Sequence, residues 1–221
     1  MDVNQLVQTV AIYALPVLFA ITLHEAAHGY VARHFGDMTA YAQGRISLNP
    51  ARHIDLLGTI IVPVAILIAS KFAGGAGLLF GWAKPVPVNY SALRNPKQNM
   101  LWVAAAGPFA NLVMAFAWAF LFKLADLLPV TDYTRALKLM GFAGIDVNLV
   151  LMLLNLLPIL PLDGGRILAS LLPNRVAWQY SKLEPWGFPI LLLLLFTNML
   201  GVILDPMMKA SFQVIEALFQ L

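Results

Sequence analysis

Long apolar runs that contain no charged side chain divide this sequence into segments. Such runs occupy residues 3–23, 98–122 and 186–204, and a fourth run, 139–162, is interrupted only by Asp146. A helix needs roughly 20 mostly apolar residues to cross the hydrocarbon core of a bilayer. The pattern therefore predicts four membrane-spanning helices. The first is expected to run from residue 4 to residue 35 and to end at Gly36.

The stretches between these runs have weaker patterns. Residues 38–50 partly alternate between apolar and polar positions, which predicts a small β-hairpin or sheet near the membrane interface. Residues 56–70 and 72–83 are apolar but short, and together they predict a re-entrant hairpin. Residues 206–221 predict an amphipathic surface helix. The expected fold is an all-α multipass membrane protein with about four to six spanning or re-entrant segments, forming one domain over residues 1–221.

Composition strengthens the membrane prediction. Hydrophobic residues make up 60% of the chain and charged residues only 11%, whereas soluble domains are about 25% charged. The net charge of +3 is small and scattered, so no nucleic-acid partner is expected. Cysteine is absent, which excludes disulfides and thiolate metal sites. Asp2 stands where a signal peptide has basic residues, so we expect the first segment to be retained.

Residues 23–30 (LHEAAHGY) place three ionisable side chains in the first predicted span. His24 and His28 are four residues apart, so on a helix both imidazoles can reach one zinc ion. Glu25 lies about 100° around the helix from His24, and in this pattern it can take a proton from a metal-bound water. Short patterns arise by chance, but here chance would leave charged groups in hydrocarbon, which is costly. The pattern favours a zinc-dependent catalytic centre inside the membrane.

A catalytic zinc ion usually has three protein ligands, so a further side chain is required. His34 is rejected, because Val31 replaces the glycine that would turn the chain back toward the metal. On a continuous helix His34 lies about 15 Å along the axis from His24. His53 lies in a polar stretch and is expected to be a surface histidine.

Asp163 is a better candidate for the third ligand. It lies in NLLPILPLDGGRIL, residues 155–168, where Pro158 and Pro161 interrupt the helix and two glycines allow another element to approach closely. From position alone, Asp163 is equally well explained as the cap of a following helix. Asp146 is the alternative, but it is a full span away from Asp163 and is expected near the opposite membrane face.

Three motifs in this order resemble the site-2 protease family of intramembrane metalloproteases: HEAAH at 24–28, GPFAN at 107–111 and NLLPILPLDGG at 155–165. GRISLNP and FGWAKPVPVN resemble the short bacterial and archaeal members, which lack PDZ and CBS domains. The resemblance covers nearly the whole chain. It implies that His24, His28 and Asp163 bind one zinc ion per chain and that Glu25 is the catalytic acid and base.

The resemblance also implies roles for asparagine side chains. Asn111 of the GPFAN motif and Asn155 of the NLLPILP motif correspond to residues linked in the family to substrate handling or transition-state support. Asn148 lies seven residues before Asn155, hence on a similar helix face, and is expected to line the same cavity. The alternative for each is a structural hydrogen bond between helices.

The predicted function is hydrolysis of peptide bonds within or next to transmembrane helices, with membrane-protein substrates and the lipid bilayer as partners. A homo-oligomer or a regulatory membrane partner is also considered. The first rival is a metal transporter that uses the same His, Glu and Asp side chains as a transit site. A helix-binding chaperone would not need Glu25, and a di-iron desaturase would need more than the four histidines present.

Basic residues near the ends of the spans indicate orientation. If residues 33–97 begin and end on the cytoplasmic side, nine basic residues are cytoplasmic and four are outside, with Lys71 at the tip of the predicted hairpin. The distribution predicts a multipass protein of a bacterial or archaeal cell membrane, with its active site nearer the cytoplasmic face. The nine are Arg33, Arg45, Arg52, Lys84, Arg94, Lys97, Arg166, Arg175 and Lys182, and the four are Lys123, Arg135, Lys138 and Lys209.

Overall fold

The computed structural model describes residues 3–53, 55, 58, 61 and 84–221, and every regular element listed below is a helix. The all-α prediction is therefore confirmed for the described residues. The predicted re-entrant hairpin over 56–83 lies outside them, except for residues 58 and 61. The helices are α1 (Val3–His34), α2 (Thr39–Ala42), η1 (Pro50–Arg52), η3 (Tyr90–Ala92), α4 (Pro96–Asp126), α5 (Asp132–Asn155), α6 (Asp163–Leu171), α7 (Asn174–Ser181), α8 (Glu184–Phe196) and α9 (Met199–Phe219).

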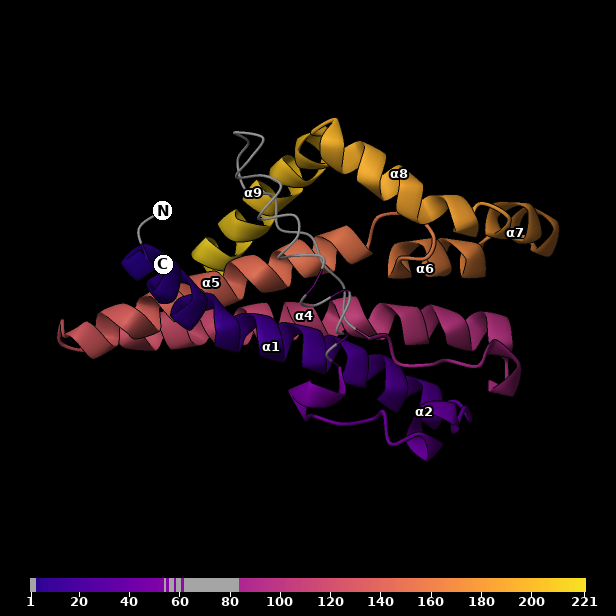
Figure 1. Ribbon diagram of the computed structural model, residues 1–221, viewed down its shortest axis with the longest axis horizontal. Coiled ribbons are helices and arrows are strands. Elements are labelled where there is room, and N and C mark those ends of the chain that lie inside the picture. The colour runs from indigo at the N-terminus through magenta and orange to yellow at the C-terminus, as the bar shows by residue number, and fades with distance from the viewer. Residues whose placement is uncertain (1–2, 54, 56–57, 59–60, 62–83) are drawn as a thin grey trace.

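Helices α1, α4 and α5 pack against one another and run along the long axis of the protein (Figure 1). Among the described residues, these are the three helices long and apolar enough to cross a membrane. Helices α8 and α9 form an arch beside them, bent by 81° where they meet, and count as a fourth span if the pair is taken as one. The short helix α6 packs against α4.

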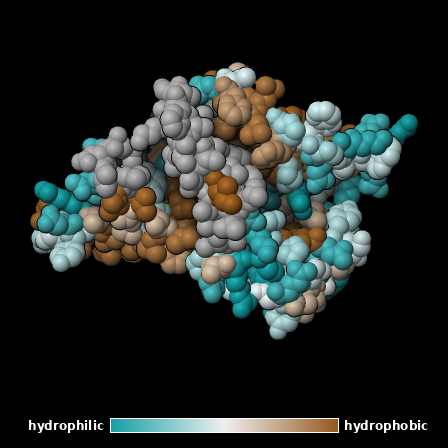
Figure 2. All heavy atoms as spheres, in the orientation of Figure 1, coloured by the Kyte–Doolittle hydropathy of each residue, from teal (hydrophilic) through white to brown (hydrophobic). Residues whose placement is uncertain are grey.

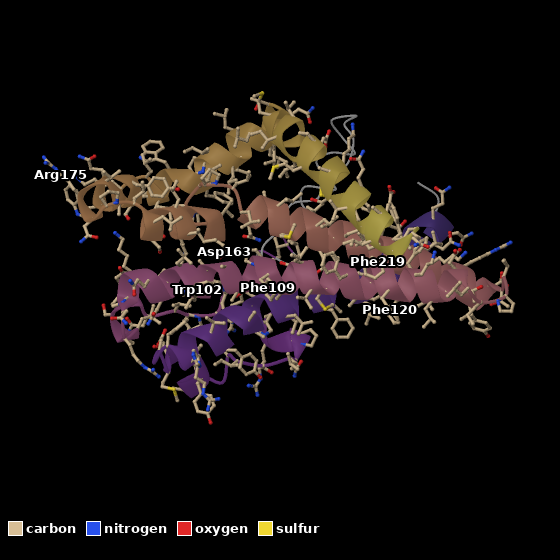
Figure 3. The ribbon with its side chains drawn as sticks, turned by 180° about the vertical axis from the view of Figure 1, so that it is seen from behind. Trp102, Phe109, Phe120, Asp163, Arg175 and Phe219 are labelled. Carbon is tan, nitrogen blue, oxygen red and sulfur yellow. The ribbon has the colours of Figure 1, made fainter. Side chains whose placement is uncertain are left out.

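The outer face of α4 is apolar and uncovered. Trp102, Phe109 and Phe120 are 60%, 64% and 59% exposed and lie along this face (Figure 3). Their spacing of seven and eleven residues is close to whole numbers of helical turns. In the view of Figure 2, hydrophilic atoms gather toward both ends of the long axis with hydrophobic atoms between them. An exposed apolar band of this kind marks membrane contact, so the chain is a membrane protein.

The apolar core lies where α4, α5 and α9 meet. Trp118 of α4, Ile145 of α5 and Ile215 of α9 are at most 5% exposed and belong to one buried cluster. The close approach of α4 and α5 depends on Gly144, because a Cβ at this position would overlap the indole ring of Trp118. Small residues at helix crossings allow such contact in membrane proteins, where packing replaces the hydrophobic driving force.

The prediction of a β-hairpin over residues 38–50 is wrong for this structure. The Asp37 carboxylate accepts a hydrogen bond from the backbone N of Thr39 at 2.9 Å, where the one-turn helix α2 begins. The Asn49 side chain accepts one from the backbone N of Ala51 at 3.1 Å, at the start of η1. Bonds between short polar side chains and nearby backbone compete with strand pairing, and the partial alternation did not outweigh them.

The C-terminal helices begin and end at other residues than the sequence pattern predicted. The span expected over 186–204 is broken at Thr197 and Asn198, because Asn198 adopts a left-handed conformation with φ 60°. The surface helix expected over 206–221 is part of α9, which begins at Met199 and contains Pro206. Membrane-spanning helices tolerate proline when neighbouring groups satisfy the freed backbone. The first helix agrees with prediction, since α1 ends at His34 and Gly36 has φ 106°.

Candidate metal centre

His24 and His28 lie on the face of α1 that packs against α4. Both side chains are buried, at 8% and 9% exposure, and their Nε2 atoms are 3.1 Å apart. The residue opposite them on α4 is Gly107. A Cβ on Gly107 would lie 2.6 Å from Cε1 and from Nε2 of His24, so only glycine leaves room for the two rings. The predicted pairing of the imidazoles on one helix face is what the structure has.

Asp163 reaches the same place from the start of α6. Its Oδ2 atom lies 3.2 Å from Nε2 of His24 and 3.3 Å from Nε2 of His28. Figure 3 shows Asp163 on the side of α6 that faces α4. The two following glycines pack against the turn at residues 156–160, where a Cβ on Gly164 or Gly165 would overlap backbone atoms. The expected close approach at this turn is therefore present.

Each imidazole has a fixed partner for its other nitrogen. Nδ1 of His24 lies 2.6 Å from Oδ1 of Asn111, and Nδ1 of His28 lies 2.6 Å from the carbonyl oxygen of Val103. Both partners are acceptors, so each Nδ1 carries the proton and donates it. This tautomer leaves the lone pair of each Nε2 free to bind a metal, as metal-ligating histidines usually require.

Three electron-pair donors therefore face one another in a buried space. Oδ2 of Asp163 has no hydrogen-bond partner among the described residues, and a carboxylate oxygen can only accept. Buried without a cation, such an arrangement is costly. Tetrahedral zinc with ligands at about 2.0–2.1 Å requires ligand atoms about 3.3–3.4 Å apart, and the separations here are 3.1, 3.2 and 3.3 Å. The residues fit one zinc ion.

Glu25 is half-buried beside this cluster and faces a different partner. Its Oε2 atom accepts a hydrogen bond of 2.7 Å from the backbone N of Val86. Val86 lies in residues 84–89, which precede η3 and belong to no helix or strand. Pro85 and Pro87 favour extended backbone here, and Asn89 is extended, so we call these residues the extended segment 84–89. The bond fixes one carboxylate oxygen and leaves the second without a recorded partner in the described residues. A carboxylate adjacent in sequence to one of the two buried histidines can exchange a proton with a water bound at this cluster.

The structure brings two of the three candidate asparagines together. Nδ2 of Asn111 lies 3.0 Å from Oδ1 of Asn148, and Nδ2 of Asn148 donates to the carbonyl of Gly144 at 2.8 Å. Both side chains are fully buried. A chain of hydrogen bonds thus runs from the His24 ring through α4 to α5. Asn155 does not join it, because its Nδ2 donates to the carbonyl of Leu151 in its own helix at 2.9 Å.

The other residues considered from the sequence lie outside the cluster. His34 is exposed at the end of α1 and does not belong to the cluster, which agrees with its rejection as a ligand. His53 is only 1% exposed, so the expectation of a surface histidine is wrong, and its Nε2 bonds to the carbonyl of Ser47 at 2.8 Å. Asp146 is half-buried and belongs to no group of metal-binding side chains within the described residues.

Some contacts of the site had no signal in the sequence. Val103 contributes a carbonyl oxygen and Val86 a backbone N–H, and neither contribution depends on the side chain. Gly107 is different, since it belongs to the GPFAN motif that was recognised for its asparagine. Its role as the space for the imidazoles could be inferred only once α1 and α4 were known to be neighbours.

Comparison with curated proteins finds relatives whose sequences are similar to this chain along most of its length. The chain is 38% identical over 208 residues to a Bacillus subtilis protein named "Putative zinc metalloprotease YwhC", covering 93% of this chain and 89% of that protein. This chain belongs to the site-2 protease family of zinc metalloproteases.

More distant members of this family are also similar. Two proteins named "Putative zinc metalloprotease Rip2" match the chain. The one from Mycolicibacterium smegmatis is 30% identical over 185 residues, covering 83% of this chain and 66% of the relative. The one from Mycobacterium tuberculosis is 29% identical over 148 residues, covering 66% and 52%. No family model matches the chain, and no solved structure matches it.

Proposed function

We propose that this protein hydrolyses peptide bonds within or next to the transmembrane helices of other membrane proteins. The observation that carries the proposal is the cluster of His24, His28 and Asp163, buried between helices that are long enough to span a membrane. Membership of a zinc metalloprotease family supports the reaction class. Suitable substrates are single-span regulatory proteins and the signal-peptide remnants left in a membrane.

The site residues have distinct tasks in this proposal. His24, His28 and Asp163 hold one zinc ion, which when bound supplies Lewis acidity for the scissile carbonyl and the attacking water. Glu25 accepts a proton from that water and delivers it to the leaving nitrogen. Asn111 keeps the His24 ring in its orientation through the bond to Nδ1.

A substrate helix hides its carbonyl groups in internal hydrogen bonds, so it must unwind locally before cleavage. An extended substrate can then pair with the extended segment 84–89, which lies beside Glu25. Asn148 and Asn155 are proposed to support the substrate or the transition state, Asn148 through Asn111. A second copy of the chain or a regulatory membrane partner remains a prediction from the sequence.

The proposed location is the plasma membrane of a bacterium or an archaeon, and the relatives come from bacteria. The excess of basic residues around residues 33–97 and 166–182 supports a site nearer the cytoplasmic face. Transport of metal ions is not favoured. The described residues contain one group of three or more metal-binding side chains, whereas a transport pathway needs successive polar positions.

The test is cleavage of tagged single-span proteins by the purified chain in proteoliposomes. Wild-type protein loaded with zinc is expected to release a shortened product. Glu25→Gln protein is expected to bind one zinc ion but to form no shortened product, because the proton acceptor is lost while the three ligands remain. Glu216→Gln is a matched control, since Glu216 is an exposed glutamate on α9 far along the chain.

Turnover by Glu25→Gln at the wild-type rate would contradict the assigned role of Glu25. Zinc flux into the liposomes without any product would instead support a transporter. Addition of a zinc chelator is expected to stop cleavage by the wild type, and its restoration by added zinc identifies the ion as required.

A further inference from the structure

A pocket of about 480 Å³, lined by both apolar and charged side chains, lies beside α6, the helix that begins at Asp163. It lies between the end of the extended segment 84–89, the start of α4, α6, α7 and the first residue of α8. Leu160, three residues before Asp163, forms part of its wall. Its charged lining residues are Lys97, Arg166 and Glu184. We define these surroundings as the α6 pocket.

Arg166 is the feature of the α6 pocket that calls for a ligand. It is half-buried, and its guanidinium makes no recorded hydrogen bond or ion pair with any residue that the structure describes. A guanidinium carries five N–H donors in a planar fork that matches a carboxylate. Lys97 is already engaged, because its Nζ donates to the carbonyl of Leu172 and to Oδ1 of Asn174. The pocket thus has an uncommitted donor group and a net positive lining.

The extended segment 84–89 connects the catalytic carboxylate to the α6 pocket. Its Val86 holds Glu25, while Val88 and, just beyond the segment, Tyr90 line the pocket. Extended chain advances about 3.3 Å per residue, so a peptide lying along the segment enters the pocket two to four residues from the position of Glu25. Lys97 lies six residues before Val103, or about 9 Å along α4, and Val103 holds the His28 ring.

The free edge of this segment is short, which limits how a peptide can pair with it. Backbone N of Lys84 donates to His53 and that of Asn89 to Asp37, at 2.9 and 2.6 Å. Pro85 and Pro87 have no N–H. The Arg45 side chain covers the carbonyls of residues 84 and 85. Backbone N of Val86 already donates to Glu25. The groups left for pairing are therefore the Val88 N–H and the carbonyls of residues 86–88, and this restriction places the same part of a bound peptide in the pocket each time.

We infer that the α6 pocket binds an acidic side chain of the substrate, located two to four residues from the scissile bond, through the Arg166 guanidinium. This inference rests on the proposed proteolytic function. A peptide carboxylate is favoured over a lipid headgroup because the pocket is continuous with the segment that touches Glu25. Glu184, the acidic member of the lining, weakens the preference by repulsion.

The experiment compares pairs of synthetic apolar peptides that differ by one Glu or Gln at each position from two to four residues either side of the cleaved bond. Binding to Glu25→Gln protein is measured in zwitterionic micelles. At the position that reaches the pocket, the Glu peptide is expected to bind about tenfold more tightly, the effect of one charge-assisted hydrogen-bond pair in a partly exposed site. Cleavage of the same pairs by the wild type is measured in parallel.

Substitutions of the charged residues that line the α6 pocket should change the preference for the Glu peptide in a defined direction. In Arg166→Gln the ratio of Glu-peptide affinity to Gln-peptide affinity should fall to near one. In Arg166→Glu, a peptide with Lys at the same position should bind more tightly than the Gln peptide. In Glu184→Gln the ratio should rise about two- to fivefold, because a repulsive charge is removed. Arg175→Gln is the matched control. Arg175 is an exposed arginine of α7, labelled in Figure 3 at the outer end of the molecule, and it does not line the pocket. It should leave the ratio unchanged.

Three outcomes would overturn the inference. The first is equal binding of both peptides at all positions, and the second is a preference that survives Arg166→Gln. The third is an Arg166-dependent effect that appears only with phosphatidylglycerol vesicles, which would assign the pocket to a lipid headgroup. If the wild type cleaves no peptide while Arg166-dependent binding is seen, the proposed proteolysis fails and the pocket assignment holds. If the wild type cleaves both peptides of every pair at equal rates, the proposed proteolysis holds and the pocket assignment fails.

Discussion

The two halves of α4 each pack against another helix at a point where a glycine lies opposite large rings, but the two contacts differ in polarity. Near its start, Gly107 leaves room for the His24 and His28 rings of α1. Further along, Trp118 projects its indole into the space left by Gly144 of α5. In both places a glycine faces large rings across a helix crossing. The first contact holds polar groups that need an ion between them, and the second holds an apolar core.

The difference teaches which part of the structure serves stability and which serves chemistry. The apolar contact includes Trp118 and Ile145 in one buried cluster with α9. The polar contact buries His24, His28 and Asn111, which stabilise the fold only when each hydrogen bond is satisfied. Substitutions at equivalent positions of the two contacts should therefore have different consequences.

The largest effect is expected for Gly107→Ala. The added Cβ would lie 2.6 Å from the His24 ring and would displace the imidazoles from their positions facing Asp163. Zinc binding should be lost, and cleavage should fall by about 100-fold or more, since misplacement by about 1 Å has effects of that size. Zinc content per chain and product formation measure the two losses. A Gly107→Ala protein that retains both would show that the crossing is looser than described.

Asn111→Ala should have the next largest effect, again confined to the polar contact. It removes the acceptor that orients the His24 ring, so zinc affinity should fall about 10- to 100-fold. Competition with a chelator of known affinity measures the change. Asn155→Ala is the control for zinc affinity, because its amide bonds within its own helix. Equal losses in both variants would contradict the separate positions of the two asparagines.

Gly144→Ala should affect the apolar contact and spare the metal. Its Cβ would overlap the Trp118 indole, and overpacking of this kind typically costs about 1–3 kcal/mol in the free energy of unfolding. Denaturation in micelles measures that loss, while the folded fraction should still bind one zinc ion per chain. Loss of zinc from protein that remains folded would mean that the two contacts are coupled, for example through Asn148 and the carbonyl of Gly144.

The smallest effect is expected beyond both contacts. Lys138 and Asp126 form an exposed ion pair of 2.5 Å between α4 and α5, far from the metal centre. Exposed ion pairs contribute little to stability, so Asp126→Asn should leave unfolding, zinc content and cleavage unchanged within error. A measurable loss of cleavage would indicate that this end of the helices influences the site.

Much of the helical framework was predictable from the sequence, because apolar runs of spanning length admit few alternatives. The limits of α1 and α4 follow the predicted runs closely. The errors arose where short polar side chains or a single backbone conformation decided the outcome. Residues 38–50 contain helical turns that begin at Asp37 and Asn49, and Asn198 breaks the span predicted over 186–204.

Some features of the site were likewise predictable from the sequence and others were not. The pairing of His24 with His28 was predictable from helical spacing, and Asp163 from a family motif. The backbone contributions of Val86 and Val103 were not, since any residue could supply them. The burial of His53 was missed because its polar neighbours in the sequence are not its neighbours in space. Patterns along a chain identify the side chains of a site. The groups that hydrogen-bond to those side chains depend on which helices pack together.

The distance along the chain between the members of the buried cluster has a consequence during synthesis. His24 and His28 belong to the first helix, and Asp163 follows about 140 residues later. At about 5–20 residues per second, the ribosome adds Asp163 roughly 7 to 28 seconds after the histidines. Asn111, which orients the His24 ring, is added within that interval. A nascent chain therefore enters the membrane with an incomplete cluster, and His24, His28 and Asp163 can come together only after most of the helices have been made.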